Sequence, residues 1–333
     1  MSTRPSGSDP GVGRAPSQPS PLRPRALRSG DTVAVVAPSS RVDPALLEEG
    51  VALLQSWGFT VRCLPSTAHA RRYLAGTSDA EKGRELTACF ADPSVAGILC
   101  ARGGYGAMRV LPFIDFHVVR AHPKVFCGYS DVTALHLAFR REAGLITFHG
   151  PMVQRQNDEP VLHPWTVDGL RRALTTSEPL GRITAPPDAP APTTVVGGRA
   201  RGPLVGGNLS LVAALCGTRW QLDARGCVLL LEDVNEAPYR VDRMLTQLLL
   251  AGVLAGVRGL VFGDSPTCDR PNDPRTFTLV EILHDRVAPL GIPVLYGFPC
   301  GHTPWRATLP LGIEVELNAD AGTLTVLEPA CLP

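Results

Sequence analysis

A serine, a histidine and a glutamate, far apart along this 333-residue chain, could together build a reactive nucleophile. The serine, Ser130, follows an apolar run and begins a helical pattern. A serine at a sharp strand-to-helix turn is pushed off the carboxyl edge of a sheet, beside the free N–H groups of the first helical turn. Those N–H groups and the helix dipole suit an oxyanion. The second glycine of the hydrolase elbow is missing, so on local sequence alone a plain N-cap is the more common role of such a serine.

A general base and its supporting acid are predicted in the second half of the chain. His302 ends the segment 297–302, where two glycines and a proline fix a loop around one imidazole. Histidine is the usual general base for a serine nucleophile because it accepts and returns a proton near neutral pH. Glu232 ends a strongly apolar run, and a carboxylate there can orient the imidazole. Asp233 and Glu236 are close competitors, and any of the three could instead be a solvated charge or a helix cap.

A glycine-rich loop, Gly103-Gly104-Tyr105-Gly106, follows another apolar run. Glycines let backbone N–H groups approach a ligand or an oxyanion closely. The loop matches neither a dinucleotide-binding fingerprint nor a phosphate-binding loop, and by itself it also fits a tight turn between a strand and a helix. It gains weight because the strand ends of a parallel sheet converge where ligands bind.

The other histidines and the cysteines point away from metal chemistry. His149, in Phe148-His149-Gly150-Pro151, is the second candidate base because it could line the cleft, whereas His136 is expected to pack in a helix. No HxH or HExxH pattern occurs and the nine scattered cysteines form no CxxC pair. We therefore expect no metal, no organic cofactor and no disulfide framework. The net charge of +1 argues against nucleic acid or a membrane surface as the partner.

Alternating apolar and amphipathic segments must position these residues. In the first half, strands are expected over 32–37, 59–64, 97–100 and 124–128, and helices over 44–57, 79–90 and from 130 to about 142. Short loops between alternating strands and helices predict a parallel sheet that is covered on both faces. In the second half, strands are expected over 227–231, 259–263 and 293–296, helices over 209–216 and 241–250, and a hairpin over 312–317 and 323–327.

Composition divides the chain into four segments. These are a Pro/Ser/Arg-rich tail at 1–26 that we expect to be disordered, an N-terminal α/β domain at 27–178, a Pro-rich linker at 179–200, and a C-terminal domain at 201–333. No apolar signal region follows the early arginines, and no run of about 18 apolar residues occurs. We therefore expect no membrane-spanning helix and a cytoplasmic location.

Eight blocks stand in order between about residues 27 and 328: 30–40, 101–106, 123–136, 147–152, 206–211, 231–234, 238–245 and 297–302. Together they resemble the LD-carboxypeptidases, a family of serine peptidases that acts on murein tetrapeptides and is related to microcin C immunity peptidases. The stretch 303–306 is not typical of that family. The resemblance implies a flavodoxin- or amidotransferase-like parallel-sheet N-terminal domain, a smaller C-terminal α/β domain with a hairpin, and an active site in the cleft between them.

The resemblance also implies roles for individual residues. Ser130 would be the nucleophile, His302 the base and Glu232 the acid behind it. The backbone N–H groups of Gly104 and Asp131 would form the oxyanion hole. The candidates for substrate contact are Gly103, Tyr105, Arg102, His149 and Arg240, with Arg306 as a further candidate for the substrate carboxylate.

The reaction that the resemblance implies is hydrolysis of the amide bond to the terminal D-Ala of a murein tetrapeptide. It would belong to peptidoglycan recycling and would be carried out by a homodimer without a cofactor. Two alternatives stay open. One is a hydrolase of the same fold that cleaves peptidyl- or aminoacyl-nucleotide amides of the microcin C kind, although the Gly-Gly-Tyr-Gly loop is closer to the murein enzymes. The other is a non-catalytic module that binds a murein fragment or a nucleotide.

Overall fold

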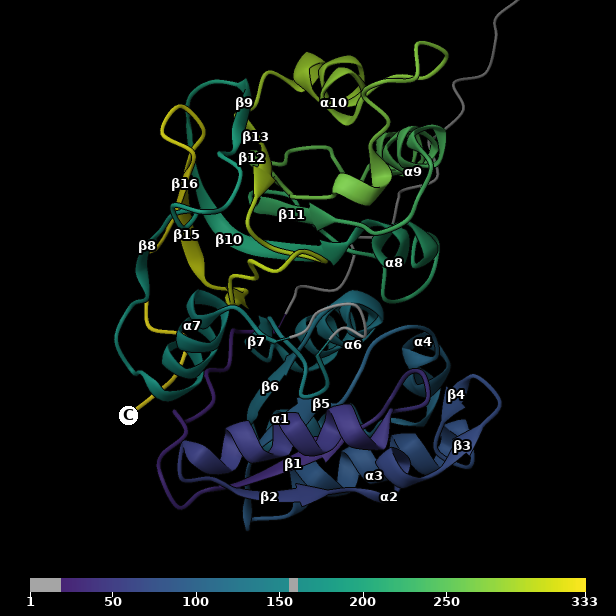
Figure 1. Cartoon of the computed structure of the whole chain (residues 1–333), viewed down its shortest axis with the longest axis vertical. Coiled ribbons are helices and arrows are strands. Elements are labelled where there is room, and N and C mark those ends of the chain that lie inside the picture. Colours follow the sequence, from purple (N-terminus) through teal and green to yellow (C-terminus); the bar gives the residue numbers. More distant parts are fainter. Residues whose placement is uncertain (1–18, 156–160) are drawn as a thin grey trace, which may run out of the picture.

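The first half of the chain builds a largely parallel sheet, in the lower part of Figure 1. In the computed structural model, which describes residues 19–155 and 161–333, its strand order is β14-β7-β6-β5-β1-β2. The strands are β1 (Thr32–Val36), β2 (Thr60–Cys63), β5 (Val95–Cys100), β6 (Val125–Gly128), β7 (Thr147–His149) and β14 (Leu309–Leu311). The first five pair in parallel, and β14 joins β7 antiparallel. The parallel sheet predicted from the apolar runs is confirmed.

Helices cover this sheet and connect its strands. They are α1 (Pro44–Ser56), α2 (Pro65–Ala68), α3 (Asp79–Ala91), α4 (Ala107–Val110), α5 (Phe116–Ala121) and α6 (Thr133–Ala138), with a small hairpin of β3 (Ala70–Arg71) and β4 (Leu74–Ala75). The helix expected from residue 130 to about 142 is divided into a 3-10 turn (Ser130–Val132), α6 and a π turn (Phe139–Ala143). The tight first turn matters for the site because it carries Ser130.

The second half of the chain builds a mixed sheet with the order β8-β16-β15-β10-β11-β12-β13-β9. Its strands are β8 (Gly181–Ile183), β9 (Thr193–Val196), β10 (Arg199–Asn208), β11 (Val228–Glu232), β12 (Gly259–Gly263), β13 (Val294–Phe298), β15 (Glu314–Asn318) and β16 (Thr323–Val326). The four central strands, β10 to β13, are parallel, and β15 and β16 form the predicted hairpin. The central strands therefore also end at one common edge.

The helices of the second half are α7 (Pro164–Thr175), α8 (Leu209–Ala214), α9 (Pro238–Leu250) and α10 (Leu279–Arg286). Short 3-10 turns lie at Leu111–Phe113 in the first half and at Pro266–Cys268 and Ala288–Leu290 in the second. α8 begins where the sequence predicts it. The side chain of Asn208 accepts a hydrogen bond from the backbone N–H of Leu211, which caps the helix.

The Pro-rich segment 179–200, expected to be a linker or crossover, contains strands of the second sheet. It supplies β8, β9 and the start of β10 to the second sheet. β9 consists of Thr193–Val196, and such β-branched residues favour extended strands. Four of the five prolines in this segment lie between β8 and β9, where no ladder N–H is required.

The prediction of a disordered tail is wrong for residues 19–26, and residues 1–18 lie outside the described part of the chain. The N–H of Leu22 donates to the carbonyl of Gly144 at 2.7 Å, and the N–H of Ala26 donates to the carbonyl of Leu332 at 2.8 Å. Ala26 is buried. These apolar side chains find a surface on the folded body, and their backbone groups pair there.

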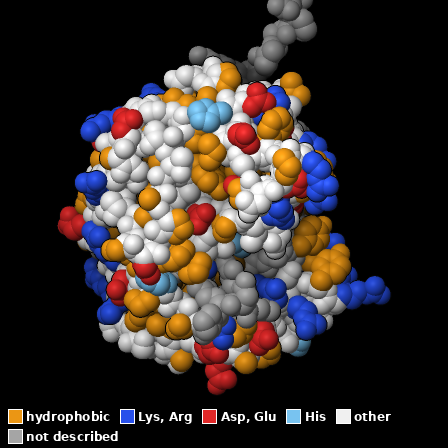
Figure 2. Space-filling model, turned by 45° about the horizontal axis from the view of Figure 1, so that its top comes forward, with side chains coloured by type: hydrophobic (Ala, Val, Ile, Leu, Met, Phe, Trp, Pro, Cys, Tyr) orange, Lys and Arg blue, Asp and Glu red, His pale blue; other side chains and the backbone are white. Residues whose placement is uncertain are grey.

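The two halves are interwoven rather than separate along the sequence. β14 comes from the second half and extends the first sheet. The buried apolar side chains form two clusters, and each cluster contains residues of both halves. No helix in the described residues is both long and apolar enough to cross a bilayer. On the face drawn in Figure 2, basic and acidic side chains are interspersed, which agrees with the near-zero net charge.

Candidate active site

The ends of strands from the two sheets bring Ser130, His302 and Glu232 together. The Ser130 hydroxyl lies 3.0 Å from Nε2 of His302, and Nδ1 of the same ring lies 2.8 Å from Oε2 of Glu232. Glu232 is fully buried, whereas the His302 side chain is 13% exposed. We call these two hydrogen bonds the Ser-His-Glu relay. A carboxylate behind an imidazole that faces a hydroxyl is the arrangement that makes a serine nucleophilic.

Ser130 stands on a strained turn directly after β6. Its φ angle is +63°, in the left-handed region that residues other than glycine, asparagine and aspartate rarely adopt. Such strain is typical of functional sites and turns the side chain out of the sheet edge. Gly103 makes room for it, because a Cβ at Gly103 would come within 3.1 Å of the Ser130 Cβ. The elbow predicted from sequence is therefore present even without a second glycine after the serine.

The glycine loop is held against this turn from two sides. The Ser40 hydroxyl accepts a hydrogen bond from the N–H of Tyr105 at 3.0 Å. Gly104 has a φ of +104°, and a Cβ there would lie 2.4 Å from the Ser40 Oγ. On the other side, the carboxylate of Asp131 accepts a hydrogen bond from the N–H of Ala107 at 2.8 Å. Burial raises the pKa of Asp131, and this backbone hydrogen bond opposes the shift.

Glycines let the histidine loop approach Glu232. A Cβ at Gly301 would lie 2.7 Å from the Glu232 Oε2, and one at Gly263 would lie 2.9 Å from the Glu232 Cβ. Burial acts to raise the pKa of Glu232, but the facing His302 and its hydrogen bond, with His149 and the Asn208 amide nearby, hold that pKa below its usual value. Glu232 is thus an anion at neutral pH, as a residue that must stabilise an imidazolium has to be.

The two competing carboxylates are engaged elsewhere. Asp233 accepts hydrogen bonds from the Asn208 amide at 3.1 Å and from the N–H of Ser210 at 2.9 Å. Glu236, which lies just before α9, forms an ion pair at 3.3 Å with Arg240 in the first turn of that helix. The structure therefore settles which of the three acidic residues faces His302.

The predicted substrate-contact residues divide into accessible and inaccessible ones. Tyr105 is 50% exposed, and Arg102, partly exposed, donates to the carbonyl of Arg41 at 3.0 Å. His149 is inaccessible, because its side chain has no exposed surface, and its contact with substrate stays a prediction. Arg306 is also buried, and its guanidinium donates to the carbonyl of Thr303 at 2.5 Å.

Sequence reasoning missed two supporting groups and was right about one structural residue. The role of Ser40 and of the Asp131 carboxylate in fixing the glycine loop was not foreseen, although both lie at the carboxyl edge of the first sheet. His136 packs in the core as predicted, with its ring nitrogens 2.9 Å from Thr147 Oγ1 and 2.8 Å from the Gly128 carbonyl. Among the residues that the structure describes, no group of three or more metal-binding side chains occurs.

Comparison with known proteins places this chain in a single family. Residues 33–150 match the model of the LD-carboxypeptidase N-terminal domain, and residues 201–317 match that of the C-terminal domain. A Bacillus subtilis protein named "Probable murein peptide carboxypeptidase" is 37% identical over 304 residues, 91% of this chain and 94% of that protein. The structure of muramoyltetrapeptide carboxypeptidase from Oxalobacter formigenes covers 90% of this chain and 99% of its own, with a TM-score of 0.77 and 30% identity.

The chain is also similar to a microcin immunity protein. The microcin C7 self-immunity protein MccF of Escherichia coli is 27% identical, over 93% of this chain and 97% of that protein. The solved structure of MccF in complex with aspartyl sulfamoyl adenosine has a TM-score of 0.85 and 26% identity, covering 94% of this chain and 100% of its own. The α/β fold and the site together define a hydrolase of the serine peptidase class. Within that class, the chain belongs to the LD-carboxypeptidase family.

Proposed function

We propose that this enzyme hydrolyses the amide bond between the L-centre of a diamino acid and the terminal D-Ala of murein tetrapeptides. The observation that carries the proposal is the unbroken Ser-His-Glu relay at the converging strand ends. The name of the Bacillus subtilis relative and that of the Oxalobacter formigenes structure support the substrate class. The reaction would place the enzyme in the turnover of wall peptides.

In the proposed first half of the reaction, the Ser130 Oγ attacks the carbonyl carbon while its proton passes to Nε2 of His302. Glu232 holds the ring through Nδ1 and stabilises the imidazolium that forms. The backbone N–H groups of Gly104 and Asp131 stabilise the oxyanion, and one such donor contributes about 10²–10³-fold to kcat. The C–N bond then breaks as the proton moves from His302 to the leaving amine of D-Ala.

In the second half, water attacks the ester carbonyl carbon and gives a proton to Nε2 of His302. The ester C–O bond breaks, the proton returns to Ser130, and the tripeptide leaves with a new carboxylate. The substrate also carries a free terminal carboxylate, and we assign Arg102 as its anchor. Arg102 directly precedes Gly103, which lies against Ser130, and a guanidinium binds a carboxylate in a bidentate manner.

A second candidate function is hydrolysis of the amide in an aminoacyl or peptidyl nucleotide. It is favoured by the likeness to MccF, whose solved complex contains aspartyl sulfamoyl adenosine. The two candidates share the chemistry of the relay and differ in what lies beyond the scissile bond. The homodimer that the family resemblance implies stays a prediction, which light scattering after size-exclusion chromatography tests.

Parallel assays distinguish the two candidate substrates. The purified chain is incubated with a disaccharide tetrapeptide and, separately, with a glutamyl or aspartyl sulfamoyl nucleotide, and products are identified by mass spectrometry. We expect release of D-Ala and the matching tripeptide, with kcat/KM for the tetrapeptide exceeding that for the nucleotide. Cleavage of the nucleotide alone would replace the first proposal with the second, and cleavage of neither by folded protein would overturn both.

A further inference from the structure

His149 is a buried titratable residue that the proposed mechanism does not use. It ends β7, which lies on the side of the first sheet that faces the second half of the chain (Figure 1). Its backbone is fixed on both sides, because it pairs with Gly128 of β6 and with Leu309 of β14. Its side chain has no exposed surface, and neither ring nitrogen has a hydrogen-bond partner within the described residues.

The surroundings of His149 keep its ring neutral. Burial lowers the pKa of His149 to about 4, with Glu232 opposing and His302 adding to this shift. A neutral imidazole carries one N–H donor and one acceptor nitrogen. Buried polar groups are almost always hydrogen-bonded in folded proteins, so an imidazole with both nitrogens unpaired requires an explanation.

The Ser-His-Glu relay also contains a buried polar atom without a hydrogen-bond partner. Oε2 of Glu232 is engaged by His302, but its other oxygen, Oε1, is buried without a partner in the described part of the chain. The Asn208 amide lies near this carboxylate and helps to lower its pKa, but it donates its hydrogen bond to Asp233 at 3.1 Å. The Tyr129 ring connects the two histidines, with its centroid 6.0 Å from that of His149 and 4.9 Å from that of His302.

We propose that His149 is a positioning residue, whose ring N–H donates through one buried water molecule to Oε1 of Glu232. A buried water that bridges two such groups is nearly as good as a direct hydrogen bond. The bridge fixes the plane of the carboxylate, and the carboxylate in turn fixes the ring of His302 against Ser130. This inference rests on the proposed function, because it assigns His149 to the support of the same relay.

The test compares turnover in three His149 variants with a matched control. His149→Leu removes the donor, and we expect kcat to fall about 10–100-fold, as it does when partners behind a functional histidine are lost, with KM nearly unchanged. Since Asn and Gln each keep an N–H donor at one of the two ring positions, either His149→Asn or His149→Gln should recover most of the lost kcat. The control is Thr308→Val, because the Thr308 hydroxyl is likewise buried and unpartnered but lies against Gly150.

A measurement on the unmodified enzyme keeps the proposal testable if the variants fold poorly. Nitrogen-15 NMR of labelled histidines should show His149 neutral, in a single tautomer, with its N–H protected from exchange. A ring that averages between tautomers would overturn the proposal, as would a His149→Leu enzyme with wild-type kcat. Ser130→Ala is assayed alongside: if it is inactive while His149→Leu is normal, only this inference fails, and if it is active the proposed function fails first.

Discussion

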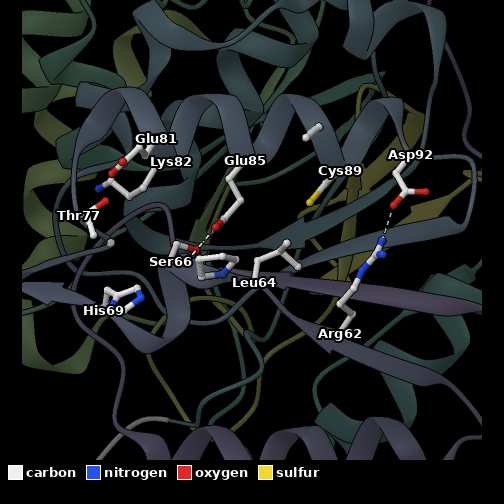
Figure 3. Close-up of a pocket in the computed structure, with 13 residues that line it drawn as sticks. Arg62, Leu64, Ser66, His69, Thr77, Glu81, Lys82, Glu85, Cys89 and Asp92 are labelled. Carbon is white, nitrogen blue, oxygen red and sulfur yellow. Dashed lines mark hydrogen bonds and ion pairs between the residues drawn. The ribbon is translucent and has the colours of Figure 1, made fainter.

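Serine, histidine and glutamate side chains also line a cavity in the described part of the chain, but there they are not linked into a relay. A cavity of about 560 Å³ lies between α2, β2 and α3, and its lining includes Ser66, Glu85 and His69 (Figure 3). None of its lining residues belongs to the Ser-His-Glu relay. The cavity and the relay thus share three residue types but differ in how these side chains are hydrogen-bonded.

The connections in the cavity are structural. The Ser66 hydroxyl accepts a hydrogen bond from the N–H of Ala37 at 2.8 Å and donates directly to Glu85. Glu85 also accepts from the N–H of Ser66 at 2.9 Å, which ties it to the start of α2. His69 lies apart from this pair, and Figure 3 marks no hydrogen bond to it. A serine bonded straight to a carboxylate has no imidazole to take up and return its proton, so it stabilises the loop after β1 rather than attacking a substrate.

The two glutamates also differ in charge environment. Burial raises the pKa of Glu85, and its hydrogen bonds from Ser66 only partly oppose that rise. Glu232 is more deeply buried, yet its pKa is lowered because an imidazole faces it. In the relay, the ionised Glu232 therefore faces the imidazole on which a positive charge must develop. In the cavity, the surroundings of Glu85 disfavour its ionised form.

The sharpest test of this comparison replaces each serine in turn. Ser130→Ala should lower kcat/KM by about 10⁴–10⁶-fold without unfolding the protein, because it removes the attacking atom. Ser66→Ala leaves the buried Ala37 N–H unpaired and should cost about 1–3 kcal/mol of stability while turnover of the folded enzyme stays normal. D-Ala release and thermal melts measure both effects. Equal losses of turnover in the two variants would contradict the distinction.

The next largest effect should come from the two glutamates. Glu232→Gln keeps the shape but removes the charge that stabilises the imidazolium, so kcat should fall about 10³–10⁴-fold. Glu85→Gln, the matched change in the cavity, should leave kcat within about threefold, because Glu85 contacts no member of the relay. Steady-state kinetics at constant pH separates them, and a normal kcat in Glu232→Gln would break the assignment of the acid.

The relay could be predicted from sequence because each member lies at the end of an apolar strand or within a few residues of it. Ser130 and Glu232 stand at strand ends, and His302 follows β13 by a short glycine-rich loop. Parallel strands of one sheet end at one edge, which brings Glu232 and His302 together, whereas Ser130 comes from the other sheet. The choice of Glu232 over Asp233 and Glu236 was open in the sequence, since all three follow the same strand and only tertiary packing assigns their partners.

The errors share a different cause, which is non-local pairing. Leu22 pairs with Leu145, and Arg25 with Leu332, so residues 19–26 are held by partners that no local pattern indicates. β14 (Leu309–Leu311) joins the sheet of the other half for the same reason. The burial of His149 also depends on strands that arrive from both halves, whereas the sequence analysis expected it to line the cleft.

A third, intermediate effect tests whether the backbone around the nucleophile is as constrained as its hydrogen bonds suggest. Gly104→Ala places a Cβ 2.4 Å from the Ser40 Oγ at a φ of +104°, so the loop must move. We expect kcat to fall about 10²-fold, as for the loss of one oxyanion donor. Gly217→Ala is the matched control, with a φ of +79° but no atom within 4 Å, and should leave kcat unchanged. Similar kcat values for both variants would show that the loop does not shape the site.

The smallest effect concerns the pH dependence of stability, and it follows from the opposite sign of the two glutamate shifts. Because the native pKa of Glu85 lies above its ordinary value of 4.5, the folded state holds this proton over a pH range in which the unfolded state has released it. Wild-type stability should therefore fall, relative to that of Glu85→Gln, as pH rises from about 4 to about 7, by a melting-temperature difference on the order of 2 °C. For Glu232 the native pKa is lowered, so its contribution to stability is present above 4.5 and is lost as pH falls through the native value. Melting curves of wild type, Glu85→Gln and Glu232→Gln across this range should diverge in opposite directions, and parallel curves would show that the two carboxyl groups share one electrostatic environment after all.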